Sequence, residues 1–335
     1  MSSSIEAAWR GKRVLVTGAG GFIGSHLTEA LVKLGARVTA LTHYNGRGDR
    51  GMLSRVPEPV LRELTVVAGD IRDPFQVRTL VEGQDAVFHL AALIAIPFSY
   101  QAPQSYLEVN AQGTLNVLEA ARACKTPRVV QTSTSEVYGT AQFTPITEQH
   151  PLQGQSPYSA SKIAADAMAE AYWRSFELPV ATVRPFNTYG PRQSTRAVLP
   201  TIVTQALATG KVALGSLDPV RDLTFVSDTV AGFLQCGASD ACVGTVTNLG
   251  TGVGFSVRQM VEAVGTALGR TLEVSADAQR QRPEKSEVQL LLADNSRARE
   301  RAGWEPKVTL ATGVLALIED VSTHPELYGV KGYHV

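Results

Sequence analysis

A tyrosine and a lysine four residues apart are the first groups in this sequence that could do acid–base chemistry. Tyr158 and Lys162 stand at the beginning of a segment of good helix formers, residues 163–176, so both side chains should lie on one face of a helix. A phenol has a pKa of about 10 and is a poor base at neutral pH, but a neighbouring ammonium group favours its ionised form. The pair therefore predicts proton transfer rather than a binding surface.

Hydroxyl and carboxylate side chains follow an apolar run shortly before this pair. Residues 129–131 indicate the end of a buried strand, and Thr134, Ser135 and Glu136 lie in the loop that comes after it. If this strand end meets the helix that carries the tyrosine, a carboxylate and two hydroxyl groups join the phenol and the ammonium. The predicted catalytic residues are Thr134, Ser135, Glu136, Tyr158 and Lys162.

A glycine-rich turn lies between a strand and a helix near the beginning of the chain. Residues 12–17 read as an apolar strand, residues 25–34 have helical spacing, and residues 38–41 read as a second strand. In such a βαβ unit the glycines allow a tight turn and a close backbone approach, and the helix N-terminus favours a pyrophosphate. The turn therefore predicts a dinucleotide site, with contacts from Gly18, Gly21, Phe22, Ile23 and Gly24.

The end of the second strand bears on the choice between NAD and NADP. NAD-binding proteins carry an acidic residue there for the ribose hydroxyl groups, whereas this chain has Thr42. His43, Asn45 and Arg47 follow and could meet a 2′-phosphate, so the sequence favours NADP over NAD as a tightly bound cofactor. The alternative is that these residues are ordinary loop polar groups.

Two further strand ends carry candidate cofactor contacts. Asp70 could accept a hydrogen bond from the adenine amino group, and Ile71 could pack on the adenine ring. After the next strand, small residues would let the backbone pass close to the cofactor, which adds Leu90, Ala91 and Ala92 to the predicted site. We expect His89, at the end of that strand, to be a packed histidine rather than a catalytic one.

The alternation of strands and helices predicts an α/β fold with a doubly wound, mostly parallel Rossmann sheet. We expect residues 11–190 to form this cofactor-binding domain, with residues 225–252 returning to it. Residues 191–224 and 253–335 should form a smaller α/β lobe that binds the substrate. No repeat or low-complexity linker separates the two parts.

Composition excludes several classes of partner. The 335 residues include 31 basic and 31 acidic side chains, without a block of like charges, which argues against a nucleic acid or an anionic membrane surface. Cys124, Cys236 and Cys242 form no metal-type or disulfide pattern. We expect a soluble cytoplasmic protein that holds no metal and does not associate with a membrane.

The motifs together resemble the extended short-chain dehydrogenase/reductases that act on nucleotide sugars. They are the glycine turn Thr17-Gly18-x-x-Gly21-x-x-Gly24, Gly69-Asp70-Ile71, His89-x-Ala91-Ala92, Asn110-x-x-Gly113-Thr114-x-Asn116, Tyr158-x-x-x-Lys162, Arg184-Pro185-x-Asn187-x-Tyr189-Gly190-Pro191, Arg221-Asp222, Asn248-Leu249-Gly250 and Arg282-Pro283. Within that family, residues 133–139 look like the 4,6-dehydratases and the nucleotide-sugar decarboxylases. Residues 43–45, 152–162 and 282–288 look most like the dehydratases that open legionaminic-acid-type pathways from a nucleotide-linked N-acetylglucosamine.

The resemblance implies a 4,6-dehydratase that acts on UDP- or GDP-N-acetylglucosamine. Bound NAD or NADP would oxidise C4, water would leave across C5 and C6, and hydride would return to C6 to give a 4-keto-6-deoxy sugar. Tyr158 would take the proton of the 4-hydroxyl group, Lys162 would hold the ribose of the nicotinamide, and Thr134 would bond the C4 oxygen. Glu136 would remove the C5 proton, which the C4 ketone makes acidic.

Ser135 departs from the glucose-specific branch of the resemblance, which has an aspartic acid at this position. A serine is too weak an acid to protonate a leaving hydroxyl group unaided. Glu136 itself, or a water molecule, would therefore carry the proton to the departing oxygen.

The substrate's diphosphate calls for forked donors, and the smaller lobe offers several. By family position the predicted substrate contacts are Asn187, Arg196, Arg221 and Arg282. We expect Glu287 to be a solvated or helix-capping carboxylate. The resemblance also implies a homodimer, packed through two helices of the first domain.

Three other activities stay open at this point. A UDP-glucuronate decarboxylase and a nucleotide-sugar 4-epimerase share the first oxidation step with a dehydratase. A non-catalytic regulator could use the same fold to sense NAD(P), although such proteins tend to lose the tyrosine–lysine pair or the carboxylate, and this chain keeps both.

Overall fold

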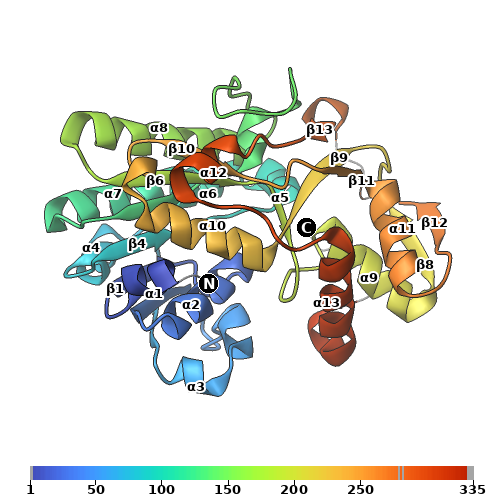
Figure 1. Cartoon of the computed structure of the whole chain (residues 1–335), viewed down its shortest axis with the longest axis horizontal. Coiled ribbons are helices and arrows are strands. Elements are labelled where there is room, and N and C mark those ends of the chain that lie inside the picture. Colours follow the sequence, from blue (N-terminus) through green and yellow to red (C-terminus); the bar gives the residue numbers. More distant parts are fainter. Residues whose placement is uncertain (1–2, 278–279, 281–282, 330–335) are drawn as a thin grey trace.

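The computed structural model describes residues 3–277, 280 and 283–329. Arg282, one of the predicted substrate contacts, lies outside these residues. Within them the chain forms two lobes, and Figure 1 shows the larger one built around a central sheet. None of the helices in these ranges combines the length and the apolar character that a membrane crossing requires.

The larger lobe is organised on a parallel sheet of seven strands. In sheet order these strands are β10 (Val246–Leu249), β6 (Val180–Pro185), β5 (Val129–Thr132), β4 (Ala86–His89), β1 (Arg13–Thr17), β2 (Arg37–His43) and β3 (Thr65–Gly69). All six neighbouring pairs run parallel. The sheet reverses its winding between β1 and β4, which is the point where doubly wound folds bind their ligands. The predicted α/β fold is confirmed.

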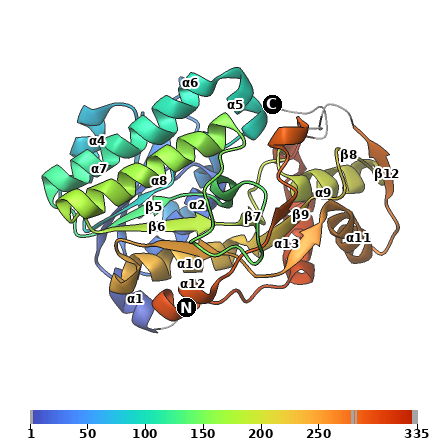
Figure 2. The same ribbon diagram turned by 90° about the horizontal axis from the view of Figure 1, so that it is seen from above.

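Helices cover both faces of this sheet, as Figures 1 and 2 show. On one face lie α4 (Pro74–Val81), α7 (Gly113–Cys124) and α8 (Pro157–Phe176), and on the other lie α1 (Ser3–Trp9), α2 (Phe22–Lys33), α10 (Val226–Ala238) and α12 (Ser296–Ala302). Short helical segments connect them: η1 (Gly51–Arg55), α3 (Glu58–Leu61), α5 (Ile96–Gln101), α6 (Pro103–Tyr106), the π-helical η2 (Leu107–Gln112), η3 (Ser135–Tyr138) and η4 (Asp240–Cys242). The inner strands β1, β4, β5 and β6 are almost fully buried, whereas the edge strand β3 is partly exposed.

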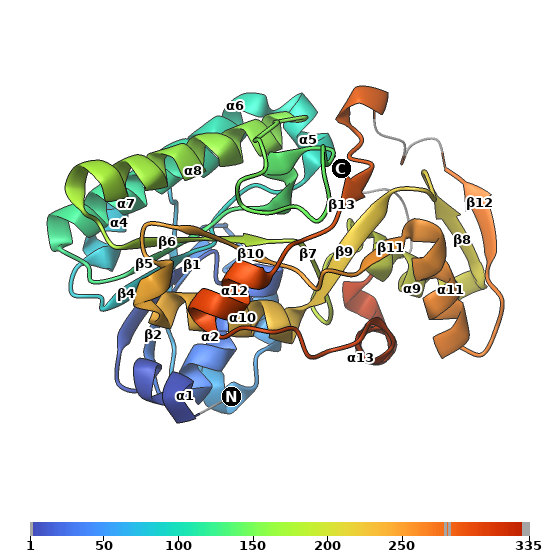
Figure 3. The ribbon, with the colours of Figure 1, turned by 45° about the horizontal axis from the view of Figure 1, so that its top comes forward.

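The smaller lobe has its own core. Its helices are α9 (Val198–Thr209), α11 (Val257–Ala267) and α13 (Leu310–Thr323), which pack on one another, and α9 also packs against β8 (Lys211–Leu214), which pairs with β12 (Glu273–Ala276). A second small sheet joins β11 (Gly254–Ser256), β9 (Val220–Phe225) and β13 (Leu290–Leu291), and β7 (Asn187–Tyr189) pairs with β9. Figure 3 shows β7 and β9 running between the two lobes.

The domain prediction differs from the structure at α12. The sequence predicts residues 253–335 in the smaller lobe, yet Ala298 and Trp304 belong to the core that α2 and α10 share with the main sheet. The indole of Trp304 also donates to the carbonyl of Asp228 on α10 at 2.8 Å. The return of β10 and α10 to the larger lobe agrees with the predicted return of residues 225–252.

The outer face of α7 and α8 bears on the predicted homodimer. Phe176 is half exposed under the guanidinium of Arg122, and Leu107 is also exposed, whereas Leu118 is buried in the core. The apolar residues of this face are therefore partly core and partly surface, and the dimer stays a prediction.

Candidate active site

The turn between β1 and α2 leaves no room for side chains at two of its glycines. Gly18 has φ +71°, and a Cβ atom there would lie 2.7 Å from the backbone nitrogen of Ala91. A Cβ atom on Gly24 would lie 2.2 Å from the carbonyl oxygen of Gly18. No described side chain caps the N-terminus of α2 at Gly21, so its backbone N–H groups remain for a ligand. This geometry fits the pyrophosphate of a dinucleotide.

The polar groups of the loop after β2 form hydrogen bonds within the loop. The amide of Asn45 donates to the carbonyl oxygen of Asp49 at 2.7 Å and accepts from the backbone N–H groups of Arg47 and Asp49. Thr42 is buried, and His43 and Arg47 are exposed. The bonds of Asn45 therefore hold the loop, while His43 and Arg47 are exposed, and the contacts of these three residues with a 2′-phosphate stay a prediction.

Asp70 and Ile71 lie at the end of β3 as predicted, but both already have partners. The carboxylate of Asp70 forms an ion pair with Arg72 at 2.6 Å, and these hydrogen bonds lower its pKa. Ile71 is buried against α7, where a Cβ atom on Gly113 would meet it at 2.9 Å. Their contacts with adenine stay a prediction.

His89 is a packed histidine, as expected. Its Nδ1 lies 2.8 Å from the hydroxyl of Thr17, and its Nε2 lies 3.1 Å from the hydroxyl of Thr114. Burial, with a smaller effect from the charge of Lys162, lowers its pKa to about 3. The same Thr17 hydroxyl accepts from the N–H groups of Leu90 and Ala91, each at 3.2 Å, and so fixes the backbone where it passes Gly18.

Three of the predicted catalytic side chains come together between η3 and the first turn of α8. The hydroxyl of Thr134 accepts from the N–H of Glu136 at 3.2 Å and hydrogen-bonds to Tyr158. Burial raises the pKa of Tyr158, the bond from Thr134 opposes this, and the charge of Glu136 adds to the rise. Ser135 is buried, 2% exposed. The lowered phenol pKa that the sequence predicts is therefore wrong for the protein alone, because burial and the charge of Glu136 outweigh the hydrogen bond with Thr134.

α8 begins where it does because of a capping box. The hydroxyl of Ser156 accepts from the N–H of Ser159, the hydroxyl of Ser159 accepts from the N–H of Ser156, and Pro157 takes the first helical position. This start places Tyr158 and Lys162 one turn apart on the buried face. The ammonium of Lys162 donates to the carbonyl of Thr132 at 2.5 Å, and burial lowers its pKa to about 8.

A buried polar network behind Lys162 was not predicted. Asp166, one turn further along α8, accepts from the hydroxyl of Ser133 at 2.6 Å and from Arg184 at 2.8 Å. Arg184 also donates to the hydroxyl of Tyr138 at 2.9 Å, and Tyr138 donates to Asn248 at 2.8 Å. The spacing of Asp166 from Lys162 is a signal that could have found the first member.

Tyr106 is a second residue that the sequence analysis missed. Its ring packs edge-on against Tyr158 with centroids 6.2 Å apart, and its hydroxyl donates to the carbonyl of Ala95. Burial raises its pKa to about 12, and the positive charge of Arg196 opposes this. The charge of Arg196, which comes from the smaller lobe, therefore acts on the ring that packs against Tyr158.

The remaining substrate candidates lie where the lobes meet. Asn187 begins β7, and its buried side-chain oxygen has no hydrogen-bond partner within the described residues. Arg221 forms an ion pair with Glu287 at 3.0 Å, with side chains 10% and 18% exposed. Glu287 is therefore neither solvated nor a helix cap, because it neutralises an arginine predicted to bind phosphate.

One contact bridges α5 and the smaller lobe. The hydroxyl of Tyr100 lies 2.5 Å from that of Ser286, and the Ser286 hydroxyl donates to the carbonyl of Gln155 at 2.8 Å. Gln155 lies next to Ser156, the N-cap of the helix that carries Tyr158, so Ser286 is tied to the start of α8.

Comparison with known proteins agrees with this geometry. The family described as GDP-mannose 4,6 dehydratase matches residues 15–317. The UDP-glucose 4-epimerase of Mycolicibacterium smegmatis is 34% identical over 313 residues, covering 92% of this chain and 97% of that protein. The chain belongs to the extended short-chain dehydrogenase/reductase family of nucleotide-sugar epimerases and dehydratases.

Dehydratases of this family, as well as epimerases, are similar to the chain. The dTDP-glucose 4,6-dehydratase of Streptomyces griseus is 34% identical over 315 residues, covering 91% of this chain and 92% of that protein. The structure of the dTDP-glucose 4,6-dehydratase of Streptomyces venezuelae, which holds NAD, is 31% identical with a TM-score of 0.84, and covers 94% of this chain and 98% of that one. The protein is therefore a nucleotide-sugar dehydratase or epimerase.

Proposed function

We propose that this protein is an NAD-dependent nucleotide-sugar 4,6-dehydratase that acts on UDP- or GDP-N-acetylglucosamine. The single observation that carries the proposal is the position of Glu136, whose charge acts on Tyr158 within the same buried corner as Thr134. A carboxylate beside the tyrosine that takes the proton of the 4-hydroxyl group can act on the carbon next to C4, and a 4-epimerase needs no base there.

The residues divide the reaction between them. NAD, when bound, supplies the oxidation of C4 and the later reduction at C6. Tyr158 takes the proton of the 4-hydroxyl group while Thr134 holds the same oxygen, and Lys162 orients the cofactor's ribose. Glu136 removes the C5 proton once C4 is a ketone.

The departing hydroxyl group also needs a proton. Ser135 is buried, and a serine hydroxyl is too weak an acid for this step. We assign the transfer to Glu136, which gains a proton from C5, or to a water molecule that it holds. The elimination of water then needs no second carboxylic acid.

The choice of NAD over NADP has two supports. The S. venezuelae relative was solved with NAD bound. In this chain the amide of Asn45 is taken up by its own loop, which leaves fewer groups for a 2′-phosphate than the sequence suggested. Cofactor content after purification and activity with each dinucleotide test this choice.

The second candidate is a 4-epimerase, favoured by the similarity to the M. smegmatis enzyme. Mass spectrometry of the reaction products distinguishes the candidate activities. The substrates to be incubated are UDP-N-acetylglucosamine, GDP-N-acetylglucosamine, UDP-glucose and UDP-glucuronate. A dehydratase product has lost water, an epimerase product keeps the substrate mass, and a decarboxylase product has lost carbon dioxide.

The same incubation in deuterated water tests the role assigned to Glu136. Elimination through C5 exchanges that proton, so the 4-keto-6-deoxy product should carry deuterium at C5. A dehydrated product without this label overturns the C5 mechanism.

A further inference from the structure

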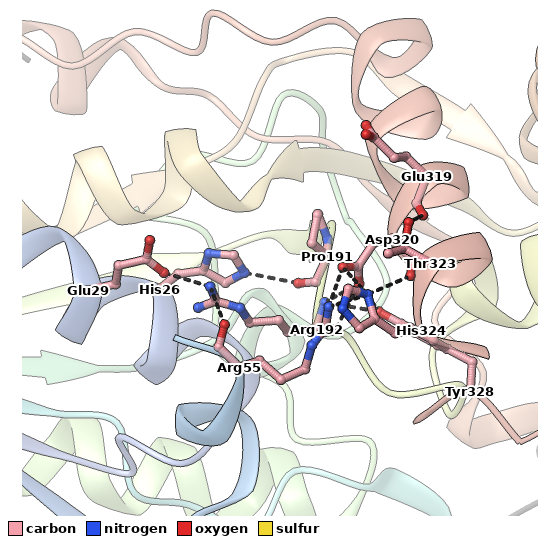
Figure 4. Close-up of polar contacts among 10 residues, drawn as sticks. All are labelled: His26, Glu29, Arg55, Pro191, Arg192, Glu319, Asp320, Thr323, His324 and Tyr328. Atoms are coloured by element: carbon pink, nitrogen blue, oxygen red, sulfur yellow. Dashed lines mark hydrogen bonds and ion pairs between the residues drawn. The ribbon is translucent and has the colours of Figure 1, made fainter. Parts of the chain in front are cut away.

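A second cluster of charged side chains joins the lobes, and no step of the proposed reaction uses it. Figure 4 shows its members converging from α2, η1, the segment after β7, and α13 with the residues that follow it. We call it the interlobe cluster: His26, Glu29, Arg55, Arg192, Asp320, His324 and Tyr328. In the ion pairs at its centre the side chains are between 10% and 13% exposed.

Arg192 stands where the chain passes from the larger lobe to the smaller one, in an uncommon conformation. Its φ is +69°, in the left-handed region that residues other than glycine rarely adopt. Its backbone N–H donates to the carboxylate of Asp320 at 3.1 Å and to the hydroxyl of Tyr328 at 3.0 Å. Its guanidinium donates to Glu29 at 2.6 Å. The surrounding contacts therefore hold a strained residue in place.

Asp320 connects the contacts of Arg192 to η1. Its two carboxylate oxygens accept from Arg55, at 2.7 and 3.1 Å, and Tyr328 donates to one of them. The carbonyl oxygen of Arg55 also lies 3.4 Å from the guanidinium of Arg192. A largely buried, two-pronged pair of this kind fixes position as well as charge. The smaller lobe thus determines where the last residue of η1 lies.

η1 in turn lies directly on the glycine turn. The N–H of Met52 donates to the carbonyl of Gly20 at 2.8 Å. Gly51 has φ +60°, and a Cβ atom on it would lie 2.4 Å from the same carbonyl oxygen. A Cβ atom on Gly20 would lie 2.8 Å from the carbonyl of Arg50. Contacts therefore run without a break from α13, through Asp320 and Arg55, to the turn that the proposed function assigns to NAD.

We propose that Arg192 and Asp320 are positioning residues for the cofactor. They hold η1 against the glycine turn, so the substrate lobe contributes to the retention of NAD. This inference rests on the proposed NAD-dependent function. It predicts that loosening the interlobe cluster releases NAD from a protein that is still folded.

The experiment measures NAD affinity by calorimetric titration of the cofactor-free protein, with folding checked by circular dichroism. Asp320→Asn and Arg192→Ala should each weaken NAD binding about tenfold or more. Arg192→Gly relieves the left-handed strain but removes the same guanidinium, so it should weaken binding as much as Arg192→Ala. Arg299→Ala is the matched control, because it removes an exposed ion pair with Glu305, 57% and 59% exposed, on α12.

A double variant tests the route through η1. If Asp320 acts by holding Arg55, the losses caused by Asp320→Asn and Arg55→Ala should not add. Tyr328→Phe, which removes one hydroxyl from the cluster, serves as a milder variant if the others fail to fold, and should weaken NAD binding measurably.

Three outcomes decide the matter. Folded variants that bind NAD as tightly as the wild type overturn the inference and leave the proposed function intact. Recovery of affinity in Arg192→Gly alone also overturns it, because the backbone and not the guanidinium would then matter. A wild-type protein that binds no NAD overturns both.

Discussion

Glu136 is the residue on which the dehydratase proposal depends, and its backbone is fixed by the hydroxyl of Thr134 at the start of η3. Replacing it by glutamine keeps the shape of the side chain and removes the base. We expect Glu136→Gln to lower the rate of dehydration by about 10²–10⁴-fold. Oxidation at C4 should persist, and the absorbance of the reduced cofactor measures it.

The matched control is Glu177→Gln, which changes an exposed carboxylate at the other end of α8. It should leave both steps unchanged. Dehydration by Glu136→Gln at the wild-type rate would assign the C5 proton to another group.

Lys162 is a proposed catalytic side chain whose charge changes close to neutral pH. Burial lowers the pKa of its ammonium group from 10.5 to about 8, although the charge of Asp166 opposes the shift. The ammonium form, which favours the Tyr158 phenolate, is therefore present below this value and lost above it. We expect kcat/KM to decline as pH rises through about 8, in a profile measured between about pH 6 and 10. A profile that stays level across this range would contradict the role of Lys162.

At the scale of elements, α8 is joined to β6 by the buried pair of Asp166 and Arg184. Their side chains are 5% and 4% exposed, and they meet at 2.8 Å. Removing one partner leaves the other charged and unpaired, which costs about 3–5 kcal/mol. We expect Asp166→Asn to lower the free energy of unfolding, measured with urea, by this amount.

The exposed pair of Arg299 and Glu305 again provides the comparison. Its loss in Glu305→Gln should change the free energy of unfolding by less than about 1 kcal/mol. If Asp166→Asn and Glu305→Gln lower the free energy of unfolding by the same amount, burial does not set the strength of the α8–β6 connection.

Local sequence patterns predicted those elements whose determinants are close together in the chain. The strands of the main sheet, the glycine turn and the shared face of Tyr158 and Lys162 depend on periodicity and on spacing of a few residues, and the structure has them. The partner of Arg221 could not be predicted, because Glu287 follows it by 66 residues and only the pairing of β9 with β13 brings them together. The loop bonds of Asn45 could not be predicted for a related reason, since they depend on the path of its own loop.

At the scale of the whole molecule, the sequence indicated two lobes but not what holds them together. α12 packs on the larger lobe and α13 on the smaller, although they follow one another directly. The segment after β7 crosses back between the lobes, and its Pro191 carbonyl lies 3.0 Å from Nε2 of His26 on α2. A long-range contact of this kind has no signature in the spacing of nearby residues.

His26 makes this junction sensitive to acid. Burial and the charge of Arg192 lower its pKa from 6.5 to about 4, against smaller opposing effects from Glu29 and Asp320. Between these two values the unfolded chain binds a proton that the folded chain does not. Stability is therefore fully present above pH 6.5 and falls as the pH drops toward 4.

The variant His26→Gln keeps an N–H donor for the Pro191 carbonyl and removes the titrating group. The wild type should lose about 2 kcal/mol more than this variant between neutral pH and pH 5, at about 1.4 kcal/mol per pH unit below the unfolded pKa. Urea unfolding of both proteins at the two pH values measures the difference. His89, whose pKa is also lowered by burial, titrates alike in both proteins and cancels. If the free energy of unfolding has the same pH dependence in the wild type and in His26→Gln, protonation of His26 does not weaken the junction. The contacts between the lobes would then open before His26 is protonated.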